Sequence, residues 1–205
     1  ISYKWLKEIL DFNLDSDQTS ALLTDIGLEV ERQDVYENIK GGLKGLIIGE
    51  VKSVEKHPNA DRLNITQVDL GEDKNYTIVC GAPNVKKGQK VIVAKPGTTI
   101  YPKNNSSFEI KNAKIRGQES FGMICAEDEI GIGDGHEGIL VLEKDANIGD
   151  SASNYFSVVR DTIFEIGLTP NRADAMSHYG VARDLLAALK FKKLLPSSSA
   201  LKAIP

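Results

Sequence analysis

The chain has 205 residues, of which 41% are hydrophobic and 26% charged, and its formal net charge is −4. These values are typical of a globular protein with one large or two small domains. No apolar run approaches the roughly 20 residues that a membrane-spanning helix needs, and the charged start ISYKWLKEIL is unlike a signal peptide. The only cysteines, Cys80 and Cys125, lack CxxC spacing, so we expect buried thiols in a reducing cytoplasm and neither a disulfide scaffold nor a zinc ribbon.

Charge is segregated along the chain. Residues 1–39 hold three basic and nine acidic side chains, whereas residues 74–116 hold nine basic and one acidic. The sign reverses again in residues 117–150, which hold one basic and nine acidic side chains. A segregated charge is compatible with a polyanionic partner even when the net charge is negative. The sequence leaves open whether the acidic segment covers the basic one, which would weaken RNA binding.

The first predicted elements are helical. YKWLKEILDF (3–12) places Trp5, Leu6, Ile9 and Leu10 on one helical stripe. Ser16 can cap a second helix, which Gly27 ends. LEVERQDVY then alternates like a strand. These elements are too few to bury a core of their own.

After the glycine-rich joint GGLKG (41–45) the hydrophobic period changes to two residues. Six candidate strands follow, at 46–56, 62–70, 75–80, 90–94, 107–115 and 138–143, with a single helical turn near 126–131. Short strands joined by Gly, Pro and Asn turns predict a closed or partly closed β-barrel.

From about residue 151 the pattern returns to mixed α/β. TIFEIG (162–167) is typical of a strand, and Ser177 can cap a final helix. That helix buries one apolar face, which comprises Val181, Leu185, Leu186 and Leu189. We therefore predict an α+β fold in which a β-barrel is inserted into a small, discontinuous, mainly helical domain. The predicted boundaries are 1–39 and 151–195 for the helical domain and 40–150 for the barrel.

HPNADRL (57–63) is the most specific local signal. Proline after His57 favours extended backbone there, and Asn and Asp favour a tight turn, so we expect a rigid loop between the first two barrel strands. That loop lines the oligonucleotide face in barrels of the OB type. We therefore predict phosphate contacts, or base stacking by the histidine, from Lys56, His57 and Arg62. The alternative is that Asp61 and Arg62 only brace the turn.

Two further segments complete the predicted RNA site. VCGAPNVKKGQKV (79–91) offers Asn84, Lys86 and Lys87 as phosphate contacts, although a lysine pair is also common in a solvated hairpin. IRGQESFGM (115–123) turns sharply at its glycines and offers Arg116, whose planar fork suits phosphate. The remaining predicted contacts are Lys111, Lys114, Ser120 and Met123, with core packing as the alternative for the methionine.

Other motifs favour structure over chemistry. IGIGDGHEG does not follow a strand in the GxGxxG arrangement, so we predict no phosphate cradle there. TPNRAD (169–174) predicts a structural corner in which Arg172 and Asp174 pair. The three histidines each stand alone, and no nucleophile–base or carboxylate–metal constellation is visible. We predict no catalytic and no metal-binding residue in this chain.

Together these motifs resemble the N-terminal region of the bacterial phenylalanyl-tRNA synthetase beta subunit. ISYKWLKEIL, the HPNADRL loop, IVCGAPNV, IRGQESFGMICA and LTPNRADAMSHYGVARDLLA match it in order. The barrel alone is also similar to tRNA-binding modules that are appended to other synthetases or occur as free proteins. The flanking motifs favour the beta subunit, because the appended modules lack them.

The resemblance implies that the barrel is an OB-fold tRNA-binding domain and that the helical domain around it is winged-helix-like. It also implies a fragment of a cytoplasmic α2β2 ligase that joins phenylalanine to tRNA(Phe) with ATP and Mg²⁺. Aminoacyl transfer belongs to the alpha subunit, so the fragment alone is expected to need no cofactor and to be inactive. The start at Ile1, not Met, agrees with a fragment, and residues 196–205 are expected to begin an editing domain. The alternatives are a structural or interaction module, or a stand-alone tRNA-binding protein.

Overall fold

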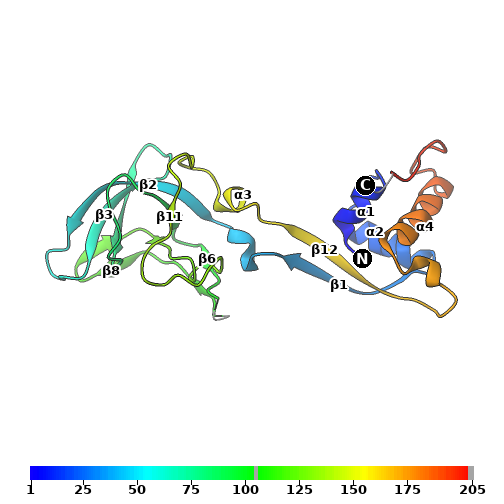
Figure 1. The fold of residues 1–205 in the computed structure, drawn as a ribbon, viewed down its shortest axis with the longest axis horizontal. Coiled ribbons are helices and arrows are strands. Elements are labelled where there is room, and N and C mark those ends of the chain that lie inside the picture. The colour runs from blue at the N-terminus through cyan, green and yellow to red at the C-terminus, as the bar shows by residue number, and fades with distance from the viewer. Residues whose placement is uncertain (104–105, 203–205) are drawn as a thin grey trace. The chain divides into compact units, whose positions relative to one another are not determined.

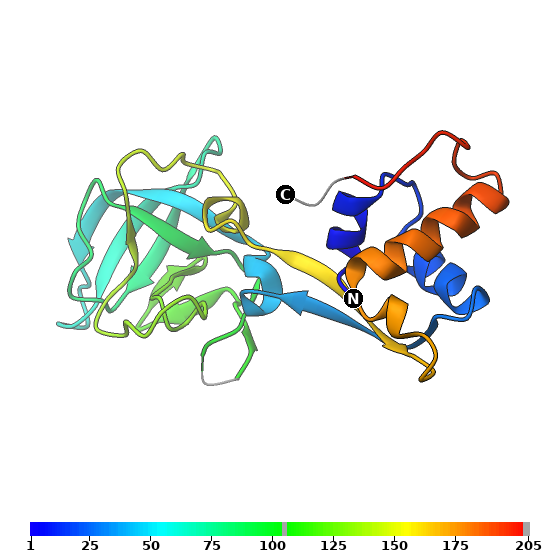
Figure 2. The same ribbon diagram turned by 45° about the vertical axis from the view of Figure 1, so that its right-hand side comes forward.

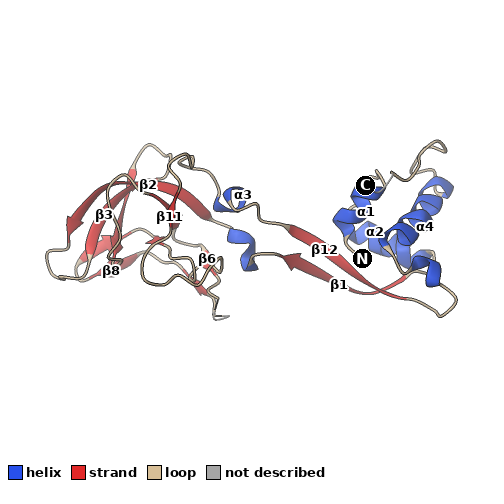
Figure 3. Ribbon diagram, viewed as in Figure 1, coloured by secondary structure: helices blue, strands red, loops and turns tan. Residues whose placement is uncertain are grey.

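The chain forms two compact units in the computed structural model, which describes residues 1–103 and 106–202. The barrel unit comprises Glu37–Val159, and the helical unit combines Ile1–Tyr36 with the chain from Arg160 onward. Figure 3 shows that strands dominate the barrel unit and helices the helical unit. The predicted fold class, a barrel inserted into a discontinuous helical unit, is confirmed. Of the predicted segment 196–205, residues 203–205 lie outside the described part.

The barrel unit extends beyond the predicted limits of 40 and 150 because its two ends bond to each other. The Asn38 N–H donates to the Val159 carbonyl over 3.1 Å, and the Val159 N–H donates to the Asn38 side chain over 2.8 Å. These reciprocal bonds satisfy backbone groups at both ends of the inserted chain.

The helical unit is built from elements at both ends of the chain (Figure 1). They are α1 (Tyr3–Ile9), α2 (Ser16–Asp25), β1 (Glu29–Glu37), β12 (Arg160–Gly167), the 3₁₀ turn η2 (Ala173–Ala175) and α4 (His178–Phe191). Strands β1 and β12 form a two-stranded sheet. The core around Leu6, Leu23, Phe164 and Leu185 draws on both parts of the chain, so neither part buries this core without the other.

Two local predictions in this unit need correction. Asp15, not Ser16, caps α2, because its carboxylate accepts the Gln18 N–H while the Gln18 side chain accepts the Asp15 N–H; this is a capping box. Trp5 does not join the buried stripe: it is 56% exposed, and its ring lies edge-on against His178 with centroids 4.6 Å apart. The predicted caps at Gly27 and Ser177 are confirmed, with φ of +85° at the glycine and a 3.0 Å bond from the Gly180 N–H to the serine hydroxyl.

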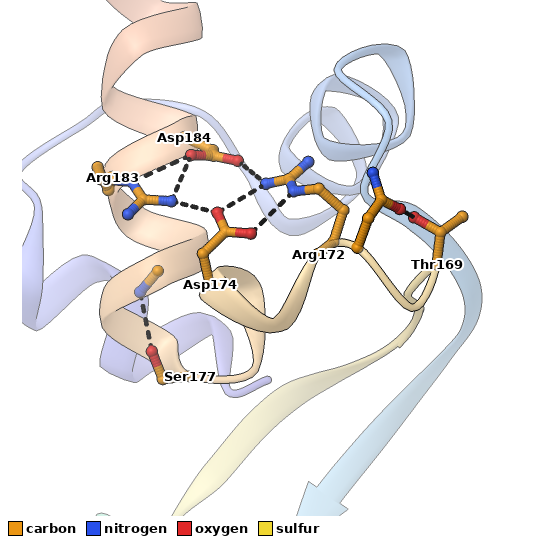
Figure 4. A network of polar contacts seen from close by, with 8 residues as sticks. Thr169, Arg172, Asp174, Ser177, Arg183 and Asp184 are labelled. Carbon is orange, nitrogen blue, oxygen red and sulfur yellow. Dashed lines mark hydrogen bonds and ion pairs between the residues drawn. The ribbon is translucent and has the colours of Figure 1, made fainter.

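The predicted pairing of Arg172 with Asp174 is confirmed as part of a larger network (Figure 4). Arg172 also pairs with Asp184, and Arg183 pairs with both aspartates. The Arg172 hydrogen bond is the main reason that the pKa of Asp174 lies below its ordinary range. The network fixes the turn before α4 to the side of that helix, so TPNRAD acts as a structural corner.

The barrel unit contains many short strands. After the 3₁₀ turn η1 (Lys40–Leu43) they are β2 (Leu46–Lys56), β3 (Asn64–Asp69), β4 (Asn75–Cys80), β5 (Lys90–Ala94), β6 (Thr99–Ile100), β7 (Phe108–Glu109), β8 (Ala113–Ile115), β9 (Gln118–Ser120), β10 (Met123–Ile124) and β11 (Val141–Leu142), followed by helix α3 (Ala152–Tyr155). The main antiparallel sheet has the order β10-β5-β2-β3-β4, and β11 also pairs with β5. Strand β2 pairs with β5 along its first half and with β3 along its second, with a register shift between Val51 and Ser53.

Two hydrogen bonds bring the last strand of this sheet back toward the first. The Phe121 N–H donates to the Thr77 carbonyl over 2.9 Å, and the Val79 N–H donates to the Ser120 hydroxyl over 3.1 Å. Thr77 and Val79 lie on β4, and Ser120 and Phe121 lie just before β10. Because β4 and β10 are the two edges of the sheet, these bonds curl it into a nearly closed barrel. Figure 2 shows these curved strands from a second direction.

The predicted strand 107–115 is two short strands, β7 and β8, that pair with β6 and β9 and not with the main sheet. The predicted helical turn at 126–131 is a hydrogen-bonded turn instead, in which the Gly131 N–H reaches the Asp128 carbonyl. The long strands were easier to predict because their hydrophobic period runs over more residues.

Candidate nucleic-acid interface

A groove with a volume of about 560 Å³ opens on the barrel unit. Its walls are mainly apolar and come from β4, β7, β8, β10 and the loops beside them; they include Leu63, Val79, Pro83, Phe108, Ile115 and Ile139. Phe108 is 45% exposed, so part of its ring faces solvent. We call this feature the barrel groove.

The basic residues predicted to bind RNA lie on chain segments that also line the barrel groove. Leu63 lines the groove from the β2–β3 loop, which carries Lys56 and Arg62 at its ends. Residues 81–83 line it from the β4–β5 loop, which carries Lys86 and Lys87. Lys111 lines the groove itself, and β8 contributes Ala113 and Ile115, which alternate along the chain with Lys114 and Arg116. Four basic segments therefore meet at one groove.

Arg116 stands at the tip of a tight hairpin. Ile115 pairs with Gln118, and the two residues between them, Arg116 and Gly117, have φ of +50° and +97°. Positive φ at both central positions is the signature of a type I′ turn, which matches the twist of paired strands. The hairpin also alternates its side chains: Ala113 and Ile115 face the barrel groove, whereas Lys114 lines a separate surface depression with Phe121.

His57 has a structural role that the sequence prediction did not give it. The side chain is 5% exposed. Its Nδ1 accepts the Asn59 N–H over 3.0 Å, and its Nε2 lies 3.1 Å from the Ile115 carbonyl. His57 therefore braces the HPNADRL turn and ties it to the β8–β9 hairpin, a task the sequence had suggested for Asp61 and Arg62. A ring held in this way has no free face on which a base could stack, so we leave His57 out of the interface.

Asn84 and Ser120 are also occupied by the fold. The Asn84 side chain donates to the Ile139 carbonyl and accepts the Ile139 N–H, both over 2.9 Å. Ser120 is 2% exposed, and its hydroxyl donates to the Gly122 carbonyl while it accepts the Val79 N–H. The buried Ser120 hydroxyl is used within the protein, and Asn84 uses its amide oxygen and one amide N–H in the same way. The structure therefore does not favour the predicted RNA contacts of these two side chains. Met123 lines the groove and also packs against the barrel core, so core packing is confirmed and its contact with RNA stays a prediction.

The remaining predicted cations are directed at solvent. Within residues 1–103 and 106–202, no carboxylate forms an ion pair with any of the following exposed side chains: Lys56, Arg62, Lys86, Lys87, Lys111, Lys114 and Arg116. Other lysines of the basic segment are neutralised, since Lys90 pairs with Glu50 over 2.9 Å and Lys95 with Glu72 over 2.6 Å. The pKa of Lys95 is raised above its ordinary value by that bond. The fold thus separates paired lysines from cations available to a ligand.

The acidic segment 117–150 covers little of the basic one. Among the described residues, Asp134 is its one member that forms an ion pair with the basic segment, through Lys103. The segment instead contributes Glu129 and Glu137 to the lining of the barrel groove, where Glu109 also lies. Carboxylates therefore lie inside the groove, while the loops that border it carry the unpaired cations.

The part of the chain that the structure describes contains no group of three or more His, Cys, Asp or Glu side chains placed to hold a metal ion. It also contains no helix that is long and apolar enough to cross a membrane. Burial raises the pKa of both the Cys80 and Cys125 thiols, which disfavours the reactive thiolate form. The site thus offers groups for binding a polyanion and lacks an activated thiol.

Comparison with known proteins defines the class. The family model for a putative tRNA-binding domain matches residues 46–151, which span the barrel strands and the barrel groove. The chain belongs to this family. One solved structure, the C-terminal domain of Plasmodium vivax p43, is 27% identical over 51% of this chain and 56% of its own, with a TM-score of 0.36, too low to support a conclusion.

Similarity to longer proteins is much closer. The beta subunit of phenylalanine–tRNA ligase from Bacteroides thetaiotaomicron is 57% identical over 92% of this chain. The corresponding subunit from Porphyromonas gingivalis is 54% identical over 93% of it. In both cases the chain spans 23% of the relative's length. The similarity covers both units, so it extends beyond the tRNA-binding family match, and the predicted resemblance is confirmed.

Proposed function

We propose that this chain is the tRNA-binding part of a phenylalanine–tRNA ligase beta subunit and that its barrel unit holds the RNA backbone. The observation that carries the proposal is a group of seven exposed cations on segments lining one groove, which form no ion pair with any residue that the structure describes. Arg and Lys supply most protein contacts to phosphate, and such contacts fix position without reading sequence. The barrel unit would therefore bind tRNA through its backbone and shape.

The activity of the whole enzyme is part of the same proposal. The complete ligase would attach phenylalanine to tRNA(Phe) with ATP and Mg²⁺, as an α2β2 assembly in the cytoplasm. Catalysis would take place in the alpha subunit. This chain would contribute tRNA contacts and organise the beta subunit, and it would need neither cofactor for its own binding function.

A salt titration of tRNA(Phe) tests the proposal. If about four of the seven cations contact phosphate at once, raising the salt from about 50 to about 200 mM should weaken binding roughly 100-fold, because neutralised phosphates release counterions. The double charge reversal Arg62→Glu/Arg116→Glu should abolish measurable binding at the higher salt. An affinity that ignores both salt and charge reversal would refute it, and an absence of tRNA crosslinks in residues 46–125 of the intact ligase would favour a structural module.

A further inference from the structure

We infer that the barrel groove binds one unpaired nucleotide of the RNA, with its base against Phe108 and with an amino group on the pairing edge of that base. The inference rests on the proposed function, because it specifies which part of the RNA the barrel unit recognises. Its central residue, Phe108, carries no charge and no catalytic signature in the sequence.

Size and chemistry of the groove fit a base. Its volume of about 560 Å³ falls in the range of small-ligand clefts, and Phe108, Pro83 and Ile115 give it apolar walls. Phe108 keeps 45% of its surface exposed, although burial of an aromatic ring is strongly favoured. An exposed ring in an apolar groove beside basic loops is what a stacking site for single-stranded nucleic acid requires.

The charges inside and outside the groove fix the orientation of the nucleotide. The groove is lined by three glutamates and by Lys111; the glutamates are Glu109, Glu129 and Glu137. The carboxylates outnumber the lysine, so a phosphate placed inside would be repelled. Glu129 is held in position by the Ala126 N–H over 2.7 Å. Carboxylates accept hydrogen bonds from base amino groups, such as N4 of cytosine. The base therefore enters the groove, and its phosphates lie outside against the unpaired cations.

The same arrangement disfavours the two obvious alternatives. A paired base cannot reach the groove, because its pairing edge is occupied and its faces are stacked in the helix. A basic apolar peptide would suit the glutamates, but the loops that line the groove would repel it. They carry four cations that have no carboxylate partner in residues 1–103 and 106–202, namely Arg62, Lys86, Lys87 and Arg116. An unpaired nucleotide satisfies both the acidic interior and the basic surroundings.

Fluorescence anisotropy with the 205-residue chain tests the inference. The probes are labelled oligocytidylate, oligouridylate of equal length and a blunt RNA duplex. Phe108→Ala should weaken oligocytidylate binding roughly tenfold, a typical loss for one stacked base, and should leave duplex binding within about twofold. Oligocytidylate should bind more tightly than oligouridylate, because uracil presents a carbonyl where cytosine presents its amino group.

Phe121→Ala is the matched control, because Phe121 is an aromatic residue of the same unit, 38% exposed, that does not line the barrel groove. Because Phe121 shares a depression with the cation Lys114, the readout is the ratio of oligocytidylate to duplex affinity, which Phe121→Ala should leave unchanged. Phe108→Leu separates loss of stacking from loss of folding, since leucine keeps an apolar contact but lacks the ring face. The melting temperature of this variant should match that of the parent chain, while its binding of oligocytidylate still falls.

Equal effects of Phe108→Ala and Phe121→Ala on oligocytidylate would overturn the inference and leave the proposed function intact. Oligouridylate binding as tightly as oligocytidylate would overturn the assignment of an amino group. The proposed function itself fails separately, if Arg62→Glu/Arg116→Glu leaves binding of the duplex and of both single strands unchanged. Capture of a basic peptide with no preference for single-stranded RNA would also overturn the inference.

Discussion

Removing Lys86 and Lys87 should change how salt affects tRNA binding. Both lysines are exposed on the β4–β5 loop, and neither has a carboxylate partner among the described residues. Each lysine–phosphate contact contributes about 0.9 to the slope of log K against log salt, so Lys86→Ala/Lys87→Ala should flatten that slope by about 1.8. The affinity at roughly 0.15 M salt should fall on the order of 30-fold. The assay is a titration of tRNA(Phe) at several salt concentrations.

The control removes a lysine of the same basic segment that is already paired. Lys95 donates to Glu72 over 2.6 Å, so Lys95→Ala removes a positive charge without removing a cation that is free for phosphate. Its slope should equal that of the parent chain. If Lys95→Ala flattens the slope by half as much as the double variant does, the distinction between paired and unpaired lysines is refuted. An unchanged slope in the double variant would remove this loop from the interface.

Three further results are expected from the contacts described above. His57→Leu should lower the free energy of unfolding by about 2 kcal/mol in urea, because the buried ring loses its bonds to two part-buried backbone groups, the Asn59 N–H and the Ile115 carbonyl. His136→Leu, on a side chain that is 79% exposed, should cost under about 0.5 kcal/mol. Gly180→Ala should destabilise the chain by more than about 3 kcal/mol despite the better helix propensity of alanine. The added Cβ would lie 2.0 Å from the Asp174 carbonyl oxygen. An unfolding midpoint equal to that of the parent would contradict this expectation. Asp174→Asn should be destabilising near pH 7, and the difference in unfolding free energy from the parent should shrink as the pH falls below the ordinary pKa of 3.8. The folded-state pKa of this carboxylate is lowered by Arg172, so its contribution to stability is lost as it protonates. A difference that persists unchanged at about pH 2 would argue against the ion pairs.

The long strands could be predicted because their signal is repeated. β2 has apolar residues at five of its eleven positions, and turns rich in Asn, Pro or Gly mark where such strands stop. The short strands β6 to β10 have two or three residues each. Two or three residues cannot establish a period, and their pairing depends on how the rest of the barrel closes.

The residues of the candidate site, like the strands, could be predicted only in part. Charge is visible in a sequence, so the cations of the interface could be predicted as a group. Accessibility is not visible, because it depends on which neighbours surround a side chain: His57, Asn84 and Ser120 have binding chemistry, but the fold uses it internally. Phe108, which we propose as the stacking residue, gives no such signal for the opposite reason: an apolar residue in an alternating strand predicts core packing, and its exposed ring emerges only from the folded barrel.

The mutual bonds between Asn38 and Val159 have a consequence for how this protein could have been assembled. A segment that leaves and returns at one point can be gained, exchanged or lost without stretching the chain that receives it. The strands that flank the segment, β1 and β12, are already paired with each other, so a short turn is all that a version without the barrel would need. The barrel unit is thus an inserted module, and we expect the helical unit to fold without it.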